Sequence, residues 1–317
     1  MEKHAEDRKI IDFAFSKFLS RKYPVWADSE IYTDNHTNKY HNHDFPQLWY
    51  CLNGTYINRV EDTDYECTKG SVVIVPPGVF HQVSVPKGES AEIVQLNVMY
   101  DFYLNFPIEQ YINTVGNLFL PPFKKELGIS FSTHIKLSQE SQAVMEECLS
   151  WFAVLEYTHS AVELDMQIRK KLETMFSIPE FTLPEKLKKK AEGFVWTRLD
   201  PIIRVVAYLN TNYEKKLTVD NIVRVSAICR ANVYRYFKLF TGYTYSQYLQ
   251  RLRTKHVYFY LKNTTYPLSY ISDMCGFYDI SHMGKVYYRY MRVKPKEFRT
   301  EKKKWLEENP QYKMRMP

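Results

Sequence analysis

The chain lacks a long apolar run, a clustered set of cysteines and an apolar segment near its start. No stretch of its 317 residues reaches the roughly 18–20 uninterrupted apolar residues that a membrane span needs, so we expect no membrane partner. The first residues are charged and unlike a signal peptide. The 5 cysteines are widely spaced without a CxxC pair, which argues against a disulfide framework and a cysteine-rich zinc site. We therefore expect a cytoplasmic protein.

Charge is distributed unevenly along the sequence. The whole chain has 43 Lys and Arg against 36 Asp and Glu, a net charge of +7. Residues 201–299 have 17 basic and 5 acidic side chains, a net charge of +12, whereas residues 1–200 have 21 basic and 28 acidic ones, a net charge of −7. The last stretch, 300–317, has a net charge of +2. Because 45% of the residues are apolar, the chain is globular, and its basic segment indicates a polyanionic partner.

The spacing of apolar residues changes along the chain. Residues 8–20 fit a short amphipathic helix, and residues 40–100 alternate short β-rich runs with turns, as in an antiparallel sandwich or barrel. Residues 138–175 have the spacing of one long amphipathic helix. We therefore expect a barrel with an N-terminal arm (1–137), an amphipathic helical segment (138–175), a linker (176–200), a basic helical domain (201–299) and a charged tail (300–317).

The first part of the basic domain predicts a helix-turn-helix unit. Thr218 is a suitable N-cap for a helix over 219–226, and a second helix over 231–240 ends at Gly242. A capping-box sequence then opens a longer helix over 245–262.

The second part repeats this pattern. A helix ends near Cys275, Asp279 is a suitable N-cap, and another helix follows over 280–290. Val233 of the first unit corresponds to Met283 of the second at an offset of 50 residues. The internal repeat predicts two similar helix-turn-helix units.

The second helix of each unit has donors and acceptors suited to DNA. Arg can bind guanine bidentately and Asn suits adenine, whereas Ser, Tyr and Lys more often hold phosphates. A solvated surface is the alternative for a single charged helix, but two such helices in a basic segment favour DNA. The candidate DNA-binding residues are Arg230, Asn232, Tyr234, Arg235, Lys238, Ile280, Ser281, His282, Lys285 and Arg289.

Residues 201–299 resemble the DNA-binding domain of AraC-type (AraC/XylS) transcription regulators. The resemblance extends over 234–242 and 248–253, and it is clearest over 271–283, followed by 295–299. It implies two helix-turn-helix units tied by a long helix, placed in successive major-groove turns of double-stranded promoter DNA, and a contact with RNA polymerase.

Arg251 and Arg253 lie in the linking helix, in a stretch that resembles the family. They leave two interpretations open, a contact with phosphates or packing inside the domain.

Elsewhere the sequence departs from that family locally. The departures concern local packing rather than the fold, and they are Val223 and Ser272 for Ala, Cys229 for a capping Ser, Arg292 for Gly, and Lys294 for a small hydroxyl residue.

The acidic part of the chain resembles the two cupin motifs, which implies a small β-barrel. Gln47 stands where metal-binding cupins have Glu, and Val85 stands where the second motif often ends in Asn. Strand alternation places Cys51 on the same inward face as the first-motif residues, lining a cavity. The motif residues are His41, His43, Gln47, Gly54, Gly70, Pro76, Pro77, Gly78 and His81.

The barrel is the expected effector site. Its histidines could instead bind a divalent metal through His41, His43, Gln47 and His81, or be purely structural. Arg59, Gln95 and Asn97 are weaker pocket candidates. The expected effector-binding residues are His41, His43, Gln47, Trp49 and His81.

Taken together, these patterns predict a multidomain α+β protein with an N-terminal cupin-like β-barrel and flanking helices, and a C-terminal all-α double helix-turn-helix. We expect a DNA-binding transcription regulator without a cofactor, which dimerises through 138–175 and responds to a small molecule. The resemblance suggests a carbohydrate. The alternatives are a metal-dependent cupin enzyme, such as a dioxygenase or isomerase, with a DNA-binding appendage, and an architectural DNA-binding protein. Gln47 and Val85 argue against the enzyme.

Overall fold

A computed structural model describes most of the chain. It covers residues 25–33, 36–43, 45–77, 79–99, 133–155, 164–182 and 195–308, with Glu185, Lys188, Lys189 and Gly193. The helix predicted over 8–20 and Gly78 of the second cupin-like motif lie outside these residues. No helix in the described part is long and apolar enough to cross a membrane. The chain divides into two compact units, with a boundary between Ile203 and Arg204.

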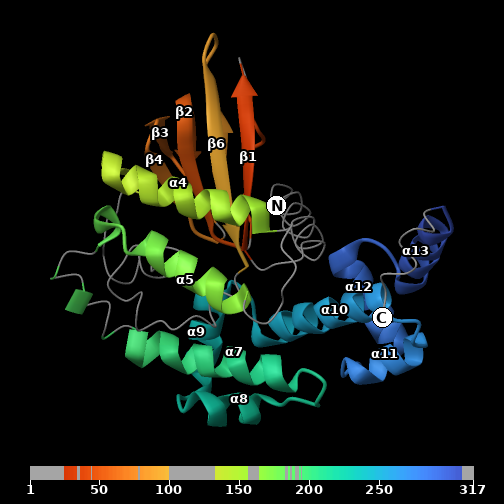
Figure 1. The fold of residues 1–317 in the computed structure, drawn as a ribbon. Helices are drawn as coiled ribbons and strands as arrows, with labels where there is room; N and C mark the ends of the chain where they lie inside the picture. The colour runs from red at the N-terminus through yellow and green to blue at the C-terminus, as the bar shows by residue number, and fades with distance from the viewer. Residues whose placement is uncertain are drawn as a thin grey trace. The chain divides into compact units, whose positions relative to one another are not determined.

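The first unit is built on antiparallel strands (Figure 1). The order is β1-β6-β2-β4-β7, and β3 and β5 also pair with β2. The strands form two sheets that share the long strand β2. Residues 47–54 of β2 pair in the first sheet, and residues 55–60 pair in the second. The strands are β1 (Val25–Thr33), β2 (Gln47–Val60), β3 (Thr63–Thr68), β4 (Ser71–Val75), β5 (His81–Ser84), β6 (Ser90–Val98) and β7 (His134–Lys136).

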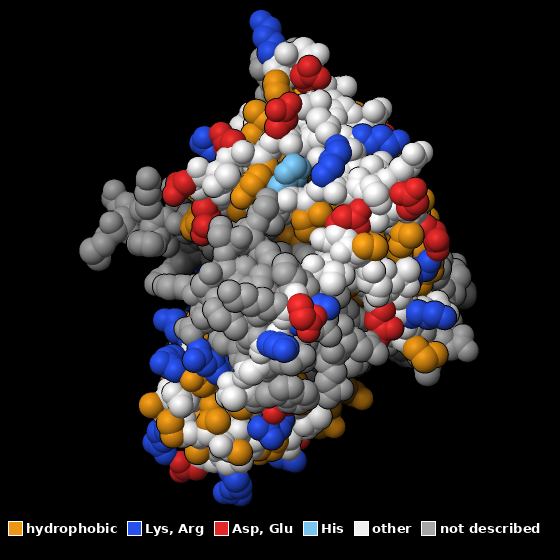
Figure 2. All heavy atoms as spheres, turned by 90° about the vertical axis from the view of Figure 1, so that its left-hand side faces the viewer, with side chains coloured by type: hydrophobic (Ala, Val, Ile, Leu, Met, Phe, Trp, Pro, Cys, Tyr) orange, Lys and Arg blue, Asp and Glu red, His pale blue; other side chains and the backbone are white. Residues whose placement is uncertain are grey.

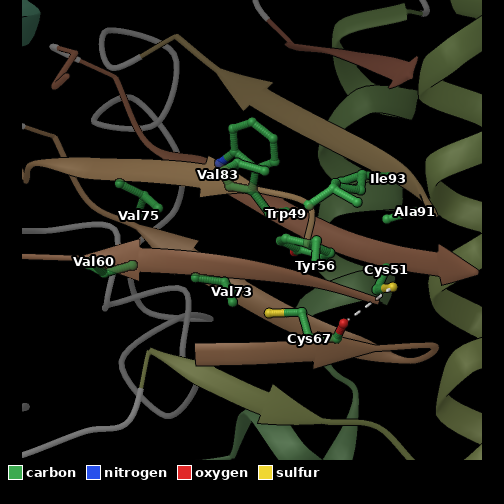
Figure 3. Close-up of a cluster of buried hydrophobic side chains, with 11 residues drawn as sticks. Trp49, Cys51, Tyr56, Val60, Cys67, Val73, Val75, Val83, Ala91 and Ile93 are labelled. Atoms are coloured by element: carbon green, nitrogen blue, oxygen red, sulfur yellow. Dashed lines mark hydrogen bonds between the residues drawn. The ribbon is translucent and has the colours of Figure 1, made fainter. Parts of the chain in front are cut away.

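Side chains from both sheets meet in one interior core (Figure 3). Trp49 and Cys51 come from the first half of β2, Tyr56 from its second half, Cys67 from β3 and Val83 from β5. All five are buried. A sheet that folds over a shared interior in this way confirms the predicted N-terminal antiparallel β-domain.

Gly54 allows β2 to pass from one sheet to the other. The register with β6 shifts between Cys51 and Asn53, and Gly54 has a φ of +74°. A Cβ atom at this position would lie 1.9 Å from the carbonyl oxygen of Ser90. Only glycine fits both the left-handed backbone and this close approach.

Two helices pack against each other and beside the sheet, where one long helix over 138–175 had been predicted. They are α4 (Gln139–Val154), which also contacts β1 and β6, and α5 (Leu164–Phe176). Lys171 of α5 forms an ion pair with Glu147 of α4. In one continuous helix these residues would be about 36 Å apart at a rise of 1.5 Å per residue, so the single helix is wrong. Folding back buries the apolar face of α5 against α4.

The start of α4 is held by a short helical turn, η4 (Pro179–Phe181). Glu180 accepts hydrogen bonds from the backbone N–H of Ser138 and the hydroxyl of Ser141, both at 2.7 Å. Ser138 is itself the N-cap of α4. A carboxylate here satisfies donors that the first turn of a helix leaves free.

The second unit is helical, as predicted. The segment η5 (Val195–Leu199) leads directly into α7, whose first residues precede the unit boundary, so the continuous helical stretch begins a few residues before 201. Its last helix reaches Glu308, into the segment that was expected to be a tail. The helices are α7 (Asp200–Asn212), α8 (Val219–Ser226), α9 (Arg230–Thr241), α10 (Tyr245–Asn263), α11 (Leu268–Met274), α12 (Ile280–Met291) and α13 (Pro295–Glu308).

The predicted caps are present. Thr218 and Thr244 each form a complete capping box, with Asn221 and Gln247 respectively. Gly242 ends α9 with a φ of +73°. Asp279 accepts a hydrogen bond from the backbone N–H at position 282, 2.6 Å away. These local contacts fix where the helices of both helix-turn-helix units begin and end.

Candidate functional sites

Helices α9 and α12 each bury one face and leave the other open. On α9 the buried face includes Val233 and Phe237, and on α12 it includes Met283 and Tyr287, the residues that correspond in the repeat. The apolar stripe fixes each helix by its inner side. The outer side is therefore free to enter a groove.

None of the predicted DNA-binding residues is buried. Asn232 and His282 are partly exposed and the other eight are exposed. Three have partners within the unit: Arg230 pairs with Asp220, Arg235 donates to the Tyr236 hydroxyl at 2.7 Å, and Arg289 donates to Gln250 at 3.2 Å. The first contact is an exposed ion pair, which is weak, and the other two are single hydrogen bonds to neutral groups, so all three can be exchanged for DNA. The individual DNA contacts stay predictions.

One residue on this side escaped sequence reasoning. Tyr278 lies in the turn before α12 and is 91% exposed. Its neighbour Phe277 packs inward, and Asp279 caps α12. An aromatic residue between a core position and an N-cap is the sequence signal that could have identified Tyr278 as an exposed candidate. An exposed tyrosine next to a recognition helix can reach a phosphate or a base edge. Hydrophobic side chains also reach the surface elsewhere on the described face in Figure 2.

Arg251 and Arg253 face the interior of the unit. The Arg251 guanidinium lies 4.5 Å from the ring centroid of Tyr243 and 5.6 Å from that of Tyr290. Arg253 donates to the carbonyl oxygens of Tyr213 and Lys215 at 2.8 and 2.9 Å. Of the two interpretations left open, packing inside the domain fits these contacts.

In the β-domain, three histidines of the cupin-like motifs come together. His41 and His81 exchange backbone hydrogen bonds of 3.0 and 2.8 Å, which places their rings 4.4 Å apart. The ring of His43 is 5.0 Å from that of His81. His43 and His81 are buried, and His41 is partly exposed. The three histidines that the cupin-like motifs single out in the sequence therefore lie close together in the structure.

The histidines keep nitrogen atoms available inside the domain. Nδ1 of His41 donates to the carbonyl of Lys39, and Nδ1 of His43 donates to that of Phe45. Nε2 of His43 and both ring nitrogens of His81 have no partner of good hydrogen-bond geometry among the described residues, although Gln47 and the backbone of Val79 lie close enough to interact with the respective rings. Burial lowers the pKa of all three, to about 3 for His43, so the rings are neutral at pH 7. Buried polar atoms without partners call for an explanation such as a ligand.

Gln47 and Trp49 adjoin this cluster. The amide of Gln47 donates to Asn97 at 2.8 Å and accepts from the Trp49 indole at 3.2 Å. The Trp49 ring lies 5.8 Å from that of His81. All five predicted effector-binding residues thus lie in one region, and Asn97, a weaker candidate, joins them.

Other residues of the β-domain change the predicted set. Arg59 faces solvent, where it pairs with Asp64 at 2.7 Å, so it is wrong as an inward pocket residue. The fully buried Asn58 was missed, and its amide has no hydrogen-bond partner among the described residues. It follows Tyr56 by two positions on β2, so strand alternation could have identified it.

The donor set does not form a ready metal centre. Among the described residues, no group of three His, Cys, Asp or Glu side chains is placed to hold a metal ion. Gln47 also brings no charge to the cluster, which a hard cation would require. A separate groove of about 500 Å³ lies between the start of α4 and the end of α5, lined by Ser141, Val144 and Ile178 among others. It contains none of the predicted effector-binding residues.

The paired helices α4 and α5 present apolar side chains to solvent. Val154 of α4 is 55% exposed and Met166 of α5 is 68% exposed. Trp151 is only partly exposed, and Leu155 is buried. Trp151 and Leu155 of the predicted amphipathic segment therefore offer less accessible surface for the expected dimer contact than Val154 and Met166 do.

Comparison with known proteins matches both parts of the chain. Residues 27–156 match the family model described as "AraC-like ligand binding domain", and residues 223–301 match the "Helix-turn-helix domain" model. The transcriptional activator RhaR of Mannheimia succiniciproducens is 21% identical over 293 residues, covering 90% of this chain and 95% of that protein.

Two further similarities cover different shares of the chain. The lactose operon transcription activator of Staphylococcus xylosus is 29% identical over 119 residues, which are 38% of this chain and 43% of that protein. The structure of ToxT from Vibrio cholerae is 14% identical, covers 88% of this chain and 98% of that chain, and has a TM-score of 0.43.

Proposed function

Because the chain belongs to the AraC-type transcription regulators, we propose that it is a cytoplasmic activator that binds promoter DNA as a homodimer and is controlled by a small-molecule effector. It is a regulator and not an enzyme, as are the relatives it matches. The proposal assigns DNA to the helical unit, the effector to the β-domain and dimerisation to α4 and α5. Contact with RNA polymerase is part of the proposed activation.

The observation that carries the effector site is the set of buried, unpartnered histidine nitrogens beside Gln47. Neutral imidazoles and amides exchange hydrogen bonds well with hydroxyl groups, and Trp49 offers a ring on which a sugar can stack. The name of the lactose operon activator, a relative, also points to sugar metabolism. We therefore propose a carbohydrate effector.

A ligand screen tests this site. A panel of mono- and disaccharides is added to the full-length protein, and the thermal midpoint is followed. A true effector at about 100 times its Kd stabilises the folded state by about 2.7 kcal/mol. His81→Leu removes two unpartnered polar atoms, so this variant should fold as well as the wild type but lose the response.

His134→Leu is the matched control, since His134 lies on β7 beside Tyr65 and outside the cluster. It should keep the full response to the sugar. A response that survives in the His81→Leu protein would show that the effector binds elsewhere. No response to any sugar would remove carbohydrates as the effector class.

DNA binding is tested by salt and by substitution. Several phosphate contacts should make the affinity fall steeply with salt, and a flat response would contradict the DNA site. Arg235→Ala should relax the preference at one base, whereas Lys238→Ala should weaken binding to all sequences. Equal, sequence-independent losses in both variants would refute this division of roles.

The dimer is tested at the exposed apolar residues of α4 and α5. Met166→Lys places a charge in the proposed seam and should shift the sedimentation of the full chain from dimer to monomer. Ile31→Lys is the control, because Ile31 is 71% exposed and belongs to β1 rather than to α4 or α5. A dimer that withstands Met166→Lys but not Ile31→Lys would move the seam to β1.

A further inference from the structure

The proposed function assigns DNA binding to the helical unit. A further proposal rests on that assignment and concerns the spacing between the two DNA sites that the unit contacts. We propose that Arg253 and the loop over 213–217 form a clasp that fixes the distance and orientation between α9 and α12. Arg253 is a positioning residue: it acts through the 213–217 loop, which contacts the turn between α11 and α12, and it does not itself contact DNA. The consequence is that the protein accepts only one spacing between its two DNA subsites.

The first element of the clasp is the bidentate contact of Arg253. This side chain starts on α10, between the two helix-turn-helix units, and reaches back to the α7–α8 loop, directly before the first helix-turn-helix unit. Its Nε donates to the carbonyl of Tyr213 at 2.8 Å, and its Nη2 donates to that of Lys215 at 2.9 Å. Two bonds from one planar group fix orientation as well as distance.

The second element joins the same loop to the second unit. Gly276, in the turn between α11 and α12, has a φ of +70°. A Cβ atom there would lie 2.5 Å from the carbonyl oxygen of Glu214 and 2.8 Å from that of Tyr213. The two units are therefore in direct backbone contact, in addition to their connection through α10. The Arg253 guanidinium also lies 5.9 Å from the ring centroid of Phe277 in this turn.

A ring contact and a second arginine brace the arrangement. His256 of α10 stacks on Tyr213 with a centroid distance of 3.7 Å and an interplanar angle of 7°. Arg251 lies against both Tyr243, just after α9, and Tyr290 of α12. Side chains of α10 thus contact the first helix-turn-helix unit both before α8 and after α9, and they connect it to the second helix-turn-helix unit.

The geometry of DNA explains why this rigidity matters. Successive major-groove sites on one face of the duplex are about 34–36 Å apart, or about 10–10.5 base pairs. One added base pair lengthens the spacing by about 3.4 Å and rotates the second subsite by about 34°. Units joined by α10 alone could follow such a change by bending at its ends. Units held by the clasp cannot, so one subsite is lost.

Spin-label distances test the clasp without DNA. Cys229 is exposed at the start of α9, whereas the other cysteines in the described chain are buried, so it provides one native label. Lys285→Cys provides the second label, on α12. The doubly labelled full-length protein, diluted with unlabelled protein, should give one narrow distance distribution. Arg253→Gln should broaden it, and an unchanged distribution would overturn the proposal.

Binding measurements then test the effect on spacing. The probe is the duplex that the wild-type full chain selects from a random library, with versions that gain or lose one base pair between the two subsites. The wild type should lose about tenfold or more in affinity for the altered duplexes. Arg253→Gln should lose less than about threefold, because its two units can adjust independently.

Two further variants separate the clasp from a charge effect. Arg253→Lys keeps the charge but cannot bind both carbonyls in a fixed geometry, so it should behave like Arg253→Gln. Lys262→Gln removes one charge from the exposed end of α10 and should keep the wild-type spacing preference. If Arg253→Gln instead weakens all duplexes equally with a smaller salt slope, and Arg253→Lys restores binding, Arg253 is a phosphate contact and the clasp is wrong. A wild type that binds no duplex would contradict the proposed function, while the spin-label distances would still test the clasp.

Discussion

Two glycines of the helical unit offer a matched test of the contact between its halves. Gly242 and Gly276 have nearly the same left-handed backbone, with φ of +73° and +70°. A Cβ atom at Gly242 would meet no atom within 4 Å, whereas one at Gly276 would press on the backbone of the α7–α8 loop. Substitution by alanine at both positions therefore separates backbone strain from the steric contact.

The magnitudes follow from these surroundings. A left-handed L-residue costs about 1–2 kcal/mol, partly offset by about 0.4–1 kcal/mol from the loss of unfolded-state freedom. Gly242→Ala should therefore destabilise the unit by about 0.5–1 kcal/mol. Gly276→Ala has the same terms and must also displace the carbonyl of Glu214 from 2.5 Å. Overpacking against backbone adds about 1–3 kcal/mol.

Native-state hydrogen exchange of the full-length chain measures both effects, since it reports opening free energies segment by segment. Gly276→Ala should lower the protection of α10 more than Gly242→Ala does, and it should also speed exchange in residues 213–217. Gly242→Ala should leave that loop unchanged. Equal losses in the two variants, with no change in the loop, would refute the close contact between the units.

Three other perturbations have defined outcomes. Arg292 ends α12 with a φ of +58°, so Arg292→Gly should stabilise the helical unit by about 0.5–1 kcal/mol after the same unfolded-state offset, measured as a higher thermal midpoint in calorimetry. Glu180→Ala removes two hydrogen bonds from the start of α4 and should lower the stability of the first unit by about 1–2 kcal/mol in urea titration. The pKa of His43 is lowered to about 3 by burial, so the unfolded chain takes up a proton below pH 6.5 that the folded chain does not. This group alone should therefore lower the stability by about 1.4 kcal/mol per pH unit as the pH falls from about 6 to about 3, and His41 and His81 add to the slope in the same direction. His43→Leu should remove its share of the slope in urea titrations at several pH values.

The features that the sequence predicted well are those with local causes. Thr218, Thr244 and Asp279 are N-caps because each side chain bonds a backbone group within three residues, and such contacts leave a sequence signature. The two helix-turn-helix units followed from a repeat that preserves the buried positions. The histidine cluster followed from a motif whose spacing reflects strand pairing.

The features that it missed depend on distant parts of the chain. An apolar stripe indicates which face of a helix is buried but not where the chain folds back, so the pairing of Lys171 with Glu147 was not foreseen. Gln47 meets Asn97 only through the register of β2 and β6. The partners of Arg253 are backbone carbonyls, which any residue can provide, so no residue type announced them.

The long strand β2 has a consequence for how the protein is made. It pairs with β3, β4, β5 and β6, and β4 pairs in turn with β7. The sheet therefore cannot close until the ribosome has released β7 at 134–136, which begins 74 residues after the end of β2 at Val60 (134 − 60). Pairings so distant in sequence make folding slow, whereas the contacts between neighbouring helices in the second unit favour rapid folding.

The two halves of the protein thus differ in how mutations reach the cell. A destabilised β2 prolongs the time during which unpaired strand edges are exposed to aggregation and proteolysis. Such a change lowers the amount of regulator rather than its affinity for DNA. Gene expression then responds to the folding yield of the sensing domain, even where no residue that binds effector or promoter has changed.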